Sequence, residues 1–166
     1  MGRVLMFVAV ILCIGACSNK QVIIDPIEEE KKILELHQLQ RKYHFEKMAE
    51  AFADQMSSNM LSVNRGEIKE ASRAENIERY SNYFNAVEFV KWDDLKDPII
   101  RFSDDYSMAY TIVNKEVVVQ YPNENDSLQN HRTEFSWVAI YKKYREGWKI
   151  DCVASTNKPN EVLPVE

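Results

Sequence analysis

The first half of the chain carries apolar residues at helical spacing. Asp25 followed by Pro26 predicts a helix that begins at Pro26, because the Asp side chain accepts from free backbone N–H groups and proline fits the first helical position. Two apolar faces then follow each other, about 175° apart around the helix axis. Their members are Ile33, Leu36, Leu39 and Tyr43, then Phe45, Met48, Phe52 and Met56. One straight helix cannot bury both faces, so we expect a break or sharp bend near Tyr43 to Phe45 and a short second helix after it.

A third helix and a series of strands are predicted downstream. Ser72 and Glu75 have the spacing of a capping box, which predicts a helix from about Arg73 to Asn85. Runs rich in Val, Ile, Tyr, Phe and Trp then predict strands at residues 87–92, 99–102, 106–121, 131–144 and 148–155. A further strand candidate covers residues 60–63 and ends at the turn 64–66, Asn-Arg-Gly.

Turn-forming residues connect the last three runs. Residues 122–126 (Pro-Asn-Glu-Asn-Asp) and 145–147 (Arg-Glu-Gly) predict short connections, and hence an antiparallel meander. Runs of about fourteen residues exceed the usual five or six, and strands of that length occur in strongly twisted, bent sheets. The predicted fold class is therefore α+β, with N-terminal helices packed into a strongly bent antiparallel sheet that encloses a cavity.

The first 16 residues have the layout of a signal peptide. Arg3 precedes an apolar run of about eleven residues, too short for the roughly 20 that a transmembrane helix needs. Residues 14–17, Ile-Gly-Ala-Cys, resemble the bacterial lipobox, which implies that Cys17 is lipidated and becomes the first residue of the mature chain. The alternative is an ordinary signal peptide with a coincidental cysteine. We expect an exported lipoprotein anchored to the bacterial cell envelope, with residues 17–24 as a tether to the membrane.

Length, charge and cysteine content limit the number of domains in the mature chain and the kinds of partner that it can bind. Removal of 16 of the 166 residues leaves 150, enough for one domain with a core, which we place at residues 25–157 with a tail at 158–166. Of 21 basic residues Arg3 is removed, so 20 remain against 26 acidic ones and the net charge is −6. This charge argues against nucleic acid as the partner. Cys152 is the one cysteine left besides Cys17, so no internal disulfide is expected, and we place Cys152 in the core.

The order of the predicted elements resembles the nuclear-transport-factor-two-like (NTF2-like) superfamily, the cystatin-like cone that includes polyketide cyclases and ketosteroid isomerases. Several short motifs are similar to an uncharacterised branch of small secreted bacterial members. They are residues 52–54 (Phe-Ala-Asp), 61–66 (Leu-Ser-Val-Asn-Arg-Gly), 92–95 (Trp-Asp-Asp-Leu), 98–100 (Pro-Ile-Ile), 107–110 (Ser-Met-Ala-Tyr) and the closing Trp137, Tyr141, Gly147-Trp148-Lys149 and Ser155-Thr156. The resemblance implies the fold. The acid–base residues of the catalytic members do not map by motif onto this chain, so none is carried over.

Metal and nucleotide cofactors are not expected. His37 and His44 lie seven residues apart on one helical face, but no third ligand stands at a diagnostic spacing. We therefore place His37 on the helix surface and His44 in capping or polar packing near the bend. After cleavage the chain retains Gly66 and Gly147 alone, too few for a phosphate-binding glycine loop.

One carboxylate is a candidate for catalysis. Asp151 lies within a predicted strand, where Asp is disfavoured, and it would share a face with Lys149 and Val153. In an apolar cavity its pKa would rise, and the group would suit general acid–base chemistry. Facing water, it would merely pair with Lys149. The pairs at 93–94 and 104–105 are interpreted as structural, because Asp at strand ends and turns serves local hydrogen bonding.

Trp92, Tyr110 and Trp137 are the residues that we expect to line a ligand cavity, although ordinary core positions would explain them too. Three functions follow, in this order of preference. The first is a membrane-anchored domain that binds a small apolar ligand. The second is an enzyme of the isomerase, cyclase or dehydratase type with a pocket carboxylate. The third is a scaffold that forms a homodimer or binds a protein through its sheet.

Overall fold

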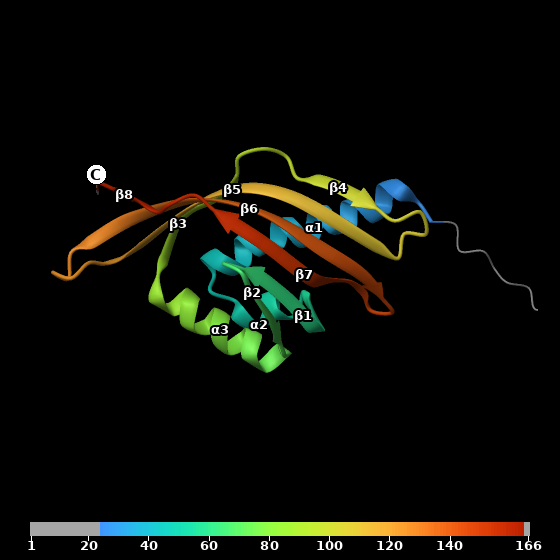
Figure 1. The fold of residues 1–166 in the computed structure, drawn as a ribbon, viewed down its shortest axis with the longest axis horizontal. Coiled ribbons are helices and arrows are strands. Elements are labelled where there is room, and N and C mark those ends of the chain that lie inside the picture. The colour runs from blue at the N-terminus through green and yellow to red at the C-terminus, as the bar shows by residue number, and fades with distance from the viewer. Residues whose placement is uncertain (1–23, 165–166) are drawn as a thin grey trace, which may run out of the picture.

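The computed structural model describes residues 24–164, so the predicted signal peptide and Cys17 lie outside the described residues. Three helices lie under an arched sheet whose longest strands run along the length of the molecule (Figure 1). The helices are α1 (Pro26–Phe45), α2 (Ala49–Ala53) and α3 (Arg73–Ala86). The strands are β1 (Met56–Asn64), β2 (Glu67–Ala71), β3 (Glu88–Asp94), β4 (Ile99–Phe102), β5 (Met108–Pro122), β6 (Leu128–Tyr144), β7 (Gly147–Asn157) and β8 (Glu161–Leu163).

Helix α1 begins and ends where the sequence predicts. The Asp25 side chain accepts from the Ile27 N–H at 3.0 Å, and the helix stops at Phe45. Lys47 then adopts a positive φ of 55°, which turns the chain into α2. The predicted break is confirmed. A long helix and a short one can thus pack on the same core.

The buried face of α1 matches the predicted one only in part: Ile33 is buried, and Leu36 and Tyr43 are half-buried against the core. The buried face consists of Glu29, Ile33, His37, Gln40 and His44, which follow one another at helical spacing and are mostly polar. Leu39, predicted to be buried, is 38% exposed. The prediction of His37 on the helix surface is wrong, since its side chain is 3% exposed. Polar residues can occupy this face because the sheet and α1 supply hydrogen-bond partners for most of them.

Helix α3 has the predicted capping box. Ser72 accepts from the Glu75 N–H at 3.3 Å, and the Glu75 carboxylate accepts from the Ser72 N–H at 2.8 Å. The helix ends at Ala86, one residue beyond the expected end. Phe84 is its fully buried apolar residue, and Tyr80 packs beside it with 5.9 Å between ring centroids. Local capping and a short apolar stripe are therefore enough to form this helix and to pack it on the core.

The sheet has the strand order β2-β1-β7-β6-β5-β3, with β4 paired to β5 and β8 paired to β6. Strands β5, β6 and β7 form the predicted antiparallel meander. Strand β1 lies parallel to β7, so the sheet is mixed. Two strands were not predicted: β2, which pairs with β1, and β8, which lies in the segment assigned to the tail.

Register shifts give the sheet its curvature. They occur between Phe89 and Lys91, between Ile140 and Tyr141, and between Met56 and Leu61. An extra residue on one strand bends it and increases its twist. The concave side of the bent sheet holds the core, which includes Phe84, Trp92, Tyr141 and Trp148. Within residues 24–164, no helix combines the length and the apolar character that a membrane crossing requires.

Candidate functional site

A cavity of about 360 Å³ lies between the concave face of the sheet and the helices. All three helices and strands β1, β3, β5, β6 and β7 contribute to its wall. The lining residues are Gln40, His44, Phe52, Met56, Met60, Ser62, Arg79, Tyr80, Tyr83, Trp92, Val117, Phe135, Trp137, Ala139, Ile150, Val153 and Ser155. Most are aliphatic or aromatic, and the set includes no carboxylate. Ligand sites are typically concave and apolar with few polar groups, and this cavity has that composition.

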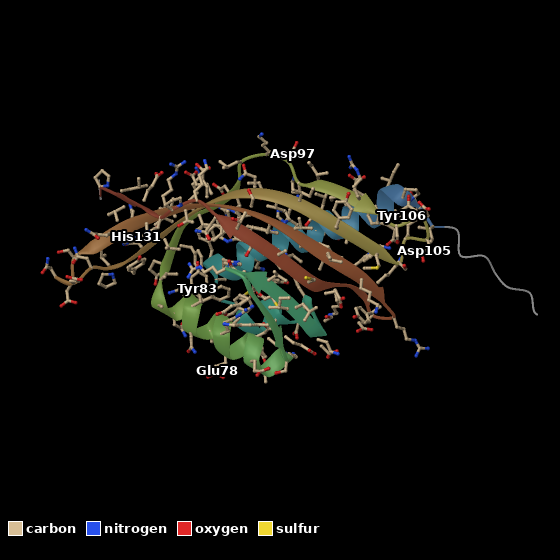
Figure 2. All side chains as sticks on the ribbon, viewed as in Figure 1. Glu78, Tyr83, Asp97, Asp105, Tyr106 and His131 are labelled. Carbon is tan, nitrogen blue, oxygen red and sulfur yellow. The ribbon has the colours of Figure 1, made fainter. Side chains whose placement is uncertain are left out.

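Side chains of α3 close one side of the cavity. Tyr83 lies where α3 approaches the sheet, whereas Glu78 projects from the outer side of the helix (Figure 2). Tyr83 packs edge-on against Phe89, with 5.5 Å between centroids. Tyr80 packs edge-on against Phe52 at 4.6 Å. Helix α3 therefore presents two tyrosines to the cavity, each in contact with a core phenylalanine, and Tyr83 is 40% exposed at its edge.

Trp92 and Trp137 both line the cavity, where their ring centroids are 6.2 Å apart. Tyr110, the third predicted wall residue, does not. It is 42% exposed and lies opposite Ile140 on the outer side of the sheet. Along β5, Ala109, Thr111 and Val113 are buried, and side chains alternate between the two faces of a strand. Position 110 therefore points outward, a consequence of register that aromatic character alone does not reveal.

His44 is the imidazole at the cavity wall. Its side chain is 6% exposed, and its ring stacks on Trp92 with 4.4 Å between centroids. Nδ1 lies 2.6 Å from the Gln40 carbonyl oxygen and donates to it, which leaves the lone pair on Nε2. Burial lowers the pKa of His44 to about 4, against the opposing effect of the Gln40 hydrogen bond. The imidazole is therefore neutral at pH 7.

A buried ion pair supports the same tryptophan from another side. The Lys115 ammonium group lies 3.5 Å from the centroid of the Trp92 ring and 2.7 Å from Asp94 Oδ1. The other carboxylate oxygen, Oδ2, lies 2.7 Å from His37 Nε2. Burial raises the pKa of Asp94, but the hydrogen bonds from His37 and Lys115 outweigh it, so the pKa is lowered. Asp94, in β3, thus connects His37 of α1 with Lys115 of β5. The side chains of His37, Asp94 and Lys115 do not line the cavity.

Asp151 lies outside the cavity lining. The register shift between Ile140 and Tyr141 makes Asp151 the extra residue of β7, without a partner on β6, and its carboxylate accepts from the Tyr144 hydroxyl at 3.0 Å. Lys149, the partner expected on a solvent-facing strand, instead donates to the backbone oxygen of Asp54 at 2.5 Å. The simple alternation used to place Asp151 fails here because a bulge changes which face the following residues occupy.

Sequence reasoning did not identify the groups around Trp92. For His44 the sequence predicts capping or polar packing, and no sequence pattern distinguishes Lys115. The spacing of Glu29, Ile33, His37, Gln40 and His44 was a usable signal, but apolar periodicity favoured another face of α1. Among residues 24–164, no cluster of three or more His, Cys, Asp or Glu side chains has the arrangement of a metal site.

Comparison with known proteins identifies the fold. No family profile matches the chain, and no curated protein matches it. An NTF2-like protein from Cytophaga hutchinsonii is 18% identical, with a TM-score of 0.59 over 78% of this chain and 98% of that one. A type 2 hexachlorocyclohexane dehydrochlorinase is 9% identical, with a TM-score of 0.67 over 83% and 90%. A protein with a cystatin-like fold from Caulobacter vibrioides is 14% identical, with a TM-score of 0.58 over 80% and 91%. The predicted NTF2-like, cystatin-like fold is confirmed.

Proposed function

We propose that this domain binds a small, mostly apolar ligand in the cavity under the bent sheet. The observation that carries the proposal is the wall itself: about 360 Å³ bounded by Trp92, Trp137 and aliphatic side chains, with a neutral imidazole and no carboxylate. Such a wall favours an apolar body, because burial of apolar surface stabilises a complex by about 25 cal/mol per Å² before the cost of association.

We also propose that the domain works at a membrane surface. Residues 14–17 resemble a lipobox behind a short apolar run, which supports export and lipidation at Cys17. Helix α1 begins at Pro26, so the tether that follows Cys17 is about 25 Å long at full extension. An anchored binding domain of this kind would take its ligand close to the bilayer of the cell envelope.

A matched pair of substitutions tests ligand binding. Ala139 lines the cavity and is 2% exposed, whereas Val138, its neighbour on β6, is 36% exposed on the outer face. Ala139→Phe should fill the cavity, and Val138→Phe should leave it open. The neutral probe N-phenyl-1-naphthylamine should raise the melting temperature of the wild type and of Val138→Phe, because a ligand stabilises by RT ln(1 + [L]/Kd).

The Ala139→Phe protein should lose the probe-induced shift while keeping its circular dichroism spectrum. Equal shifts in both variants would show that the probe binds elsewhere. If no neutral lipophilic compound shifts the wild-type melting temperature, the binding function is wrong. Each compound that binds should also be recovered and analysed for chemical change, which separates binding from turnover.

An enzyme is the second candidate, and one observation favours it. His44 holds a neutral imidazole at the cavity wall, with Nδ1 oriented by the Gln40 carbonyl group and a lone pair on Nε2. A positioned neutral imidazole can accept a proton from a bound substrate. In this alternative His44→Gln abolishes turnover with little change in affinity, whereas Asp151→Asn, outside the cavity, leaves turnover intact. The fold is compatible with catalysis, since the dehydrochlorinase shares it.

A homodimer through the outer face of the sheet is the third candidate. Side chains that are 36–47% exposed form an apolar surface across β1, β4, β5 and β6: Leu61, Ile99, Tyr110, Ile112 and Val138. The strand register places Ile99 beside Ile112, and Ile112 beside Val138. A patch of this kind suits a second copy of the chain. Sedimentation should show a dimer that Tyr110→Glu dissociates and that Ile27→Glu, at an exposed site on α1, does not.

A further inference from the structure

We propose that the ligand is amphipathic and carries a carboxylate head group, which the Arg79 guanidinium group binds at the rim of the cavity. This inference rests on the proposed binding function and specifies the class of ligand. It follows from three features of the site: its charge inventory, the way Arg79 is held, and the charges in a neighbouring hollow.

Arg79 is the one lining residue with a formal charge at neutral pH. The other polar side chains of the lining are neutral: Gln40, His44, Ser62, Tyr80, Tyr83 and Ser155. A ligand with a cationic head would therefore meet a like charge and no carboxylate. A neutral ligand would leave the guanidinium group without a charged partner. An anionic head satisfies it, and hydrogen bonds between ionised groups are about twice as strong as neutral ones.

Contacts with Tyr80 hold the guanidinium group in place. The Arg79 Cζ atom lies 4.5 Å from the centroid of the Tyr80 ring, and Nη2 donates to the Tyr80 hydroxyl at 2.5 Å. Tyr80 in turn packs on Phe52, and both line the cavity. Arginine has five N–H donors, so one hydrogen bond to Tyr80 leaves the planar fork able to bind both oxygens of a carboxylate. Because Arg79 is itself exposed at the surface, its free donors are accessible.

A second hollow next to the cavity adds positive charge. It shares Ser62 and Arg79 with the cavity, and its other lining residues come from the β1–β2 hairpin: Asn64, Arg65, Glu67 and Lys69. Lys69 Nζ pairs with Glu67 at 2.8 Å, so the hollow contains three cationic groups and one carboxylate. The sequence as a whole has a net charge of −5, whereas this hollow has a net positive charge. A local field of this sign attracts anions to the rim.

The shape and the charge together point to a monocarboxylate with an apolar body. The cavity lies at the lower end of the volumes that small-molecule sites have, so it suits one compact chain or ring system. The head group would stay at the rim, where water still solvates it, while the body displaces water inside. This arrangement avoids the cost of burying a charge without a partner.

Three probes with the same ten-carbon chain test the inference on the purified full-length chain: decanoate, 1-decanol and decylamine. Affinities are measured by displacement of N-phenyl-1-naphthylamine. The wild type should bind decanoate about tenfold more tightly than 1-decanol, at the low end of what a hydrogen bond to a charged group contributes. Decylamine should bind most weakly. Raising the salt concentration should weaken decanoate binding and leave 1-decanol binding unchanged.

Substitutions then assign the preference to Arg79. Arg79→Met should bring the decanoate-to-decanol ratio close to one with unchanged affinity for 1-decanol, and Arg79→Lys should retain part of the preference. The control is Arg145→Met, which removes the same charge from an exposed turn outside both hollows and should leave the ratio unchanged.

Two results would overturn the head-group assignment: a wild-type ratio near one or below, or an Arg79→Met ratio equal to that of the wild type. In either case binding of 1-decanol would still support the proposed function. If the neutral probe and 1-decanol both fail to bind, the proposed function fails as well. Should Arg79→Met not fold, the wild-type ratio and Arg79→Lys still decide the question.

Discussion

Replacement of Glu29 by Gln removes a single negative charge at a buried site. The carboxylate lies in the first turn of α1 and is 7% exposed. It accepts from the Trp148 indole N–H at 2.7 Å and from the ammonium groups of Lys143 at 2.8 Å and Lys32 at 2.7 Å. A Gln side chain has nearly the same shape and can still accept from the indole, but it cannot form the two ion pairs.

The unfolding free energy that Glu29→Gln should lose follows from the pKa of Glu29. Burial alone raises this pKa, but the hydrogen bonds from Lys143, Lys32 and Trp148 outweigh it and lower the pKa from 4.5 to about 2. Between pH 4.5 and pH 2 the Glu29 carboxylate binds a proton more tightly in the unfolded chain than in the folded one. The stabilisation of the folded chain by the ionised carboxylate is therefore complete above pH 4.5 and disappears as the pH falls to about 2. The difference corresponds to at most about 3 kcal/mol of unfolding free energy at pH 7.

Urea denaturation followed by tryptophan fluorescence measures this loss at pH 7, 5, 4, 3 and 2. Glu28→Gln is the control, because Glu28 lies in the same helical turn with an exposed side chain and shares the interaction with the helix dipole. The difference between wild type and Glu29→Gln should be largest at pH 7, at most about 3 kcal/mol, and shrink to near zero at pH 2. Glu28→Gln should cost less than about 1 kcal/mol at any pH.

The reasoning is refuted if Glu29→Gln behaves like Glu28→Gln at pH 7. It is equally refuted if the Glu29→Gln difference stays constant between pH 7 and pH 2, because a constant loss would come from packing and not from ionisation. Other carboxylates titrate in this range, but they do so in both proteins and cancel in the comparison.

Three further predictions concern the anchor, the core and the cavity. Radiolabelled fatty acid should enter the wild-type protein and not Cys17→Ala, and equal labelling of both would rule out lipidation at this residue. Trp148→Ala should lower the unfolding free energy by about 3–5 kcal/mol in chemical denaturation, since the side chain is 5% exposed, and a loss under about 1 kcal/mol would contradict its place in the core. The contribution of His44 to the unfolding free energy should fall by at most about 3 kcal/mol between pH 6.5 and pH 4, because burial lowers the pKa of His44 to about 4 and the unfolded chain gains the proton first. His44→Gln should lose this part of the pH dependence, and an unchanged profile would show that other groups cause it.

Much of the fold was predictable because the signals are local. Asp25 and Pro26 start α1, and Ser72 with Glu75 starts α3, through hydrogen bonds that span at most three residues. The turns at 122–126 and 145–147 produce the meander in the same way. Strand β2 was missed because its residues, Glu-Ile-Lys-Glu-Ala, are mostly polar and exposed on an edge strand. Strand β8 has three residues, too few for a periodic signal.

The candidate site was predictable in part. Trp92 and Trp137 were selected for their size and amphipathic character, and both line the cavity. Tyr110 has the same character but points to the outer face, and Asp151 is itself the extra residue of a bulge that breaks the alternation. Which face of a strand is concave depends on register with its neighbours, and one strand read alone contains no such information.

The sequence by itself determined the helices, the long strands and their antiparallel turns, and the length of those strands indicated a bent sheet. Only the tertiary structure decided which polar residues of α1 are buried. Glu29 reads as an ordinary acidic residue of a helix start, yet its partner Trp148 lies 119 positions away, and His37 is buried against Asp94 57 positions away. A polar side chain is stable in the core where a partner satisfies it, and the presence of that partner is a property of the assembled fold.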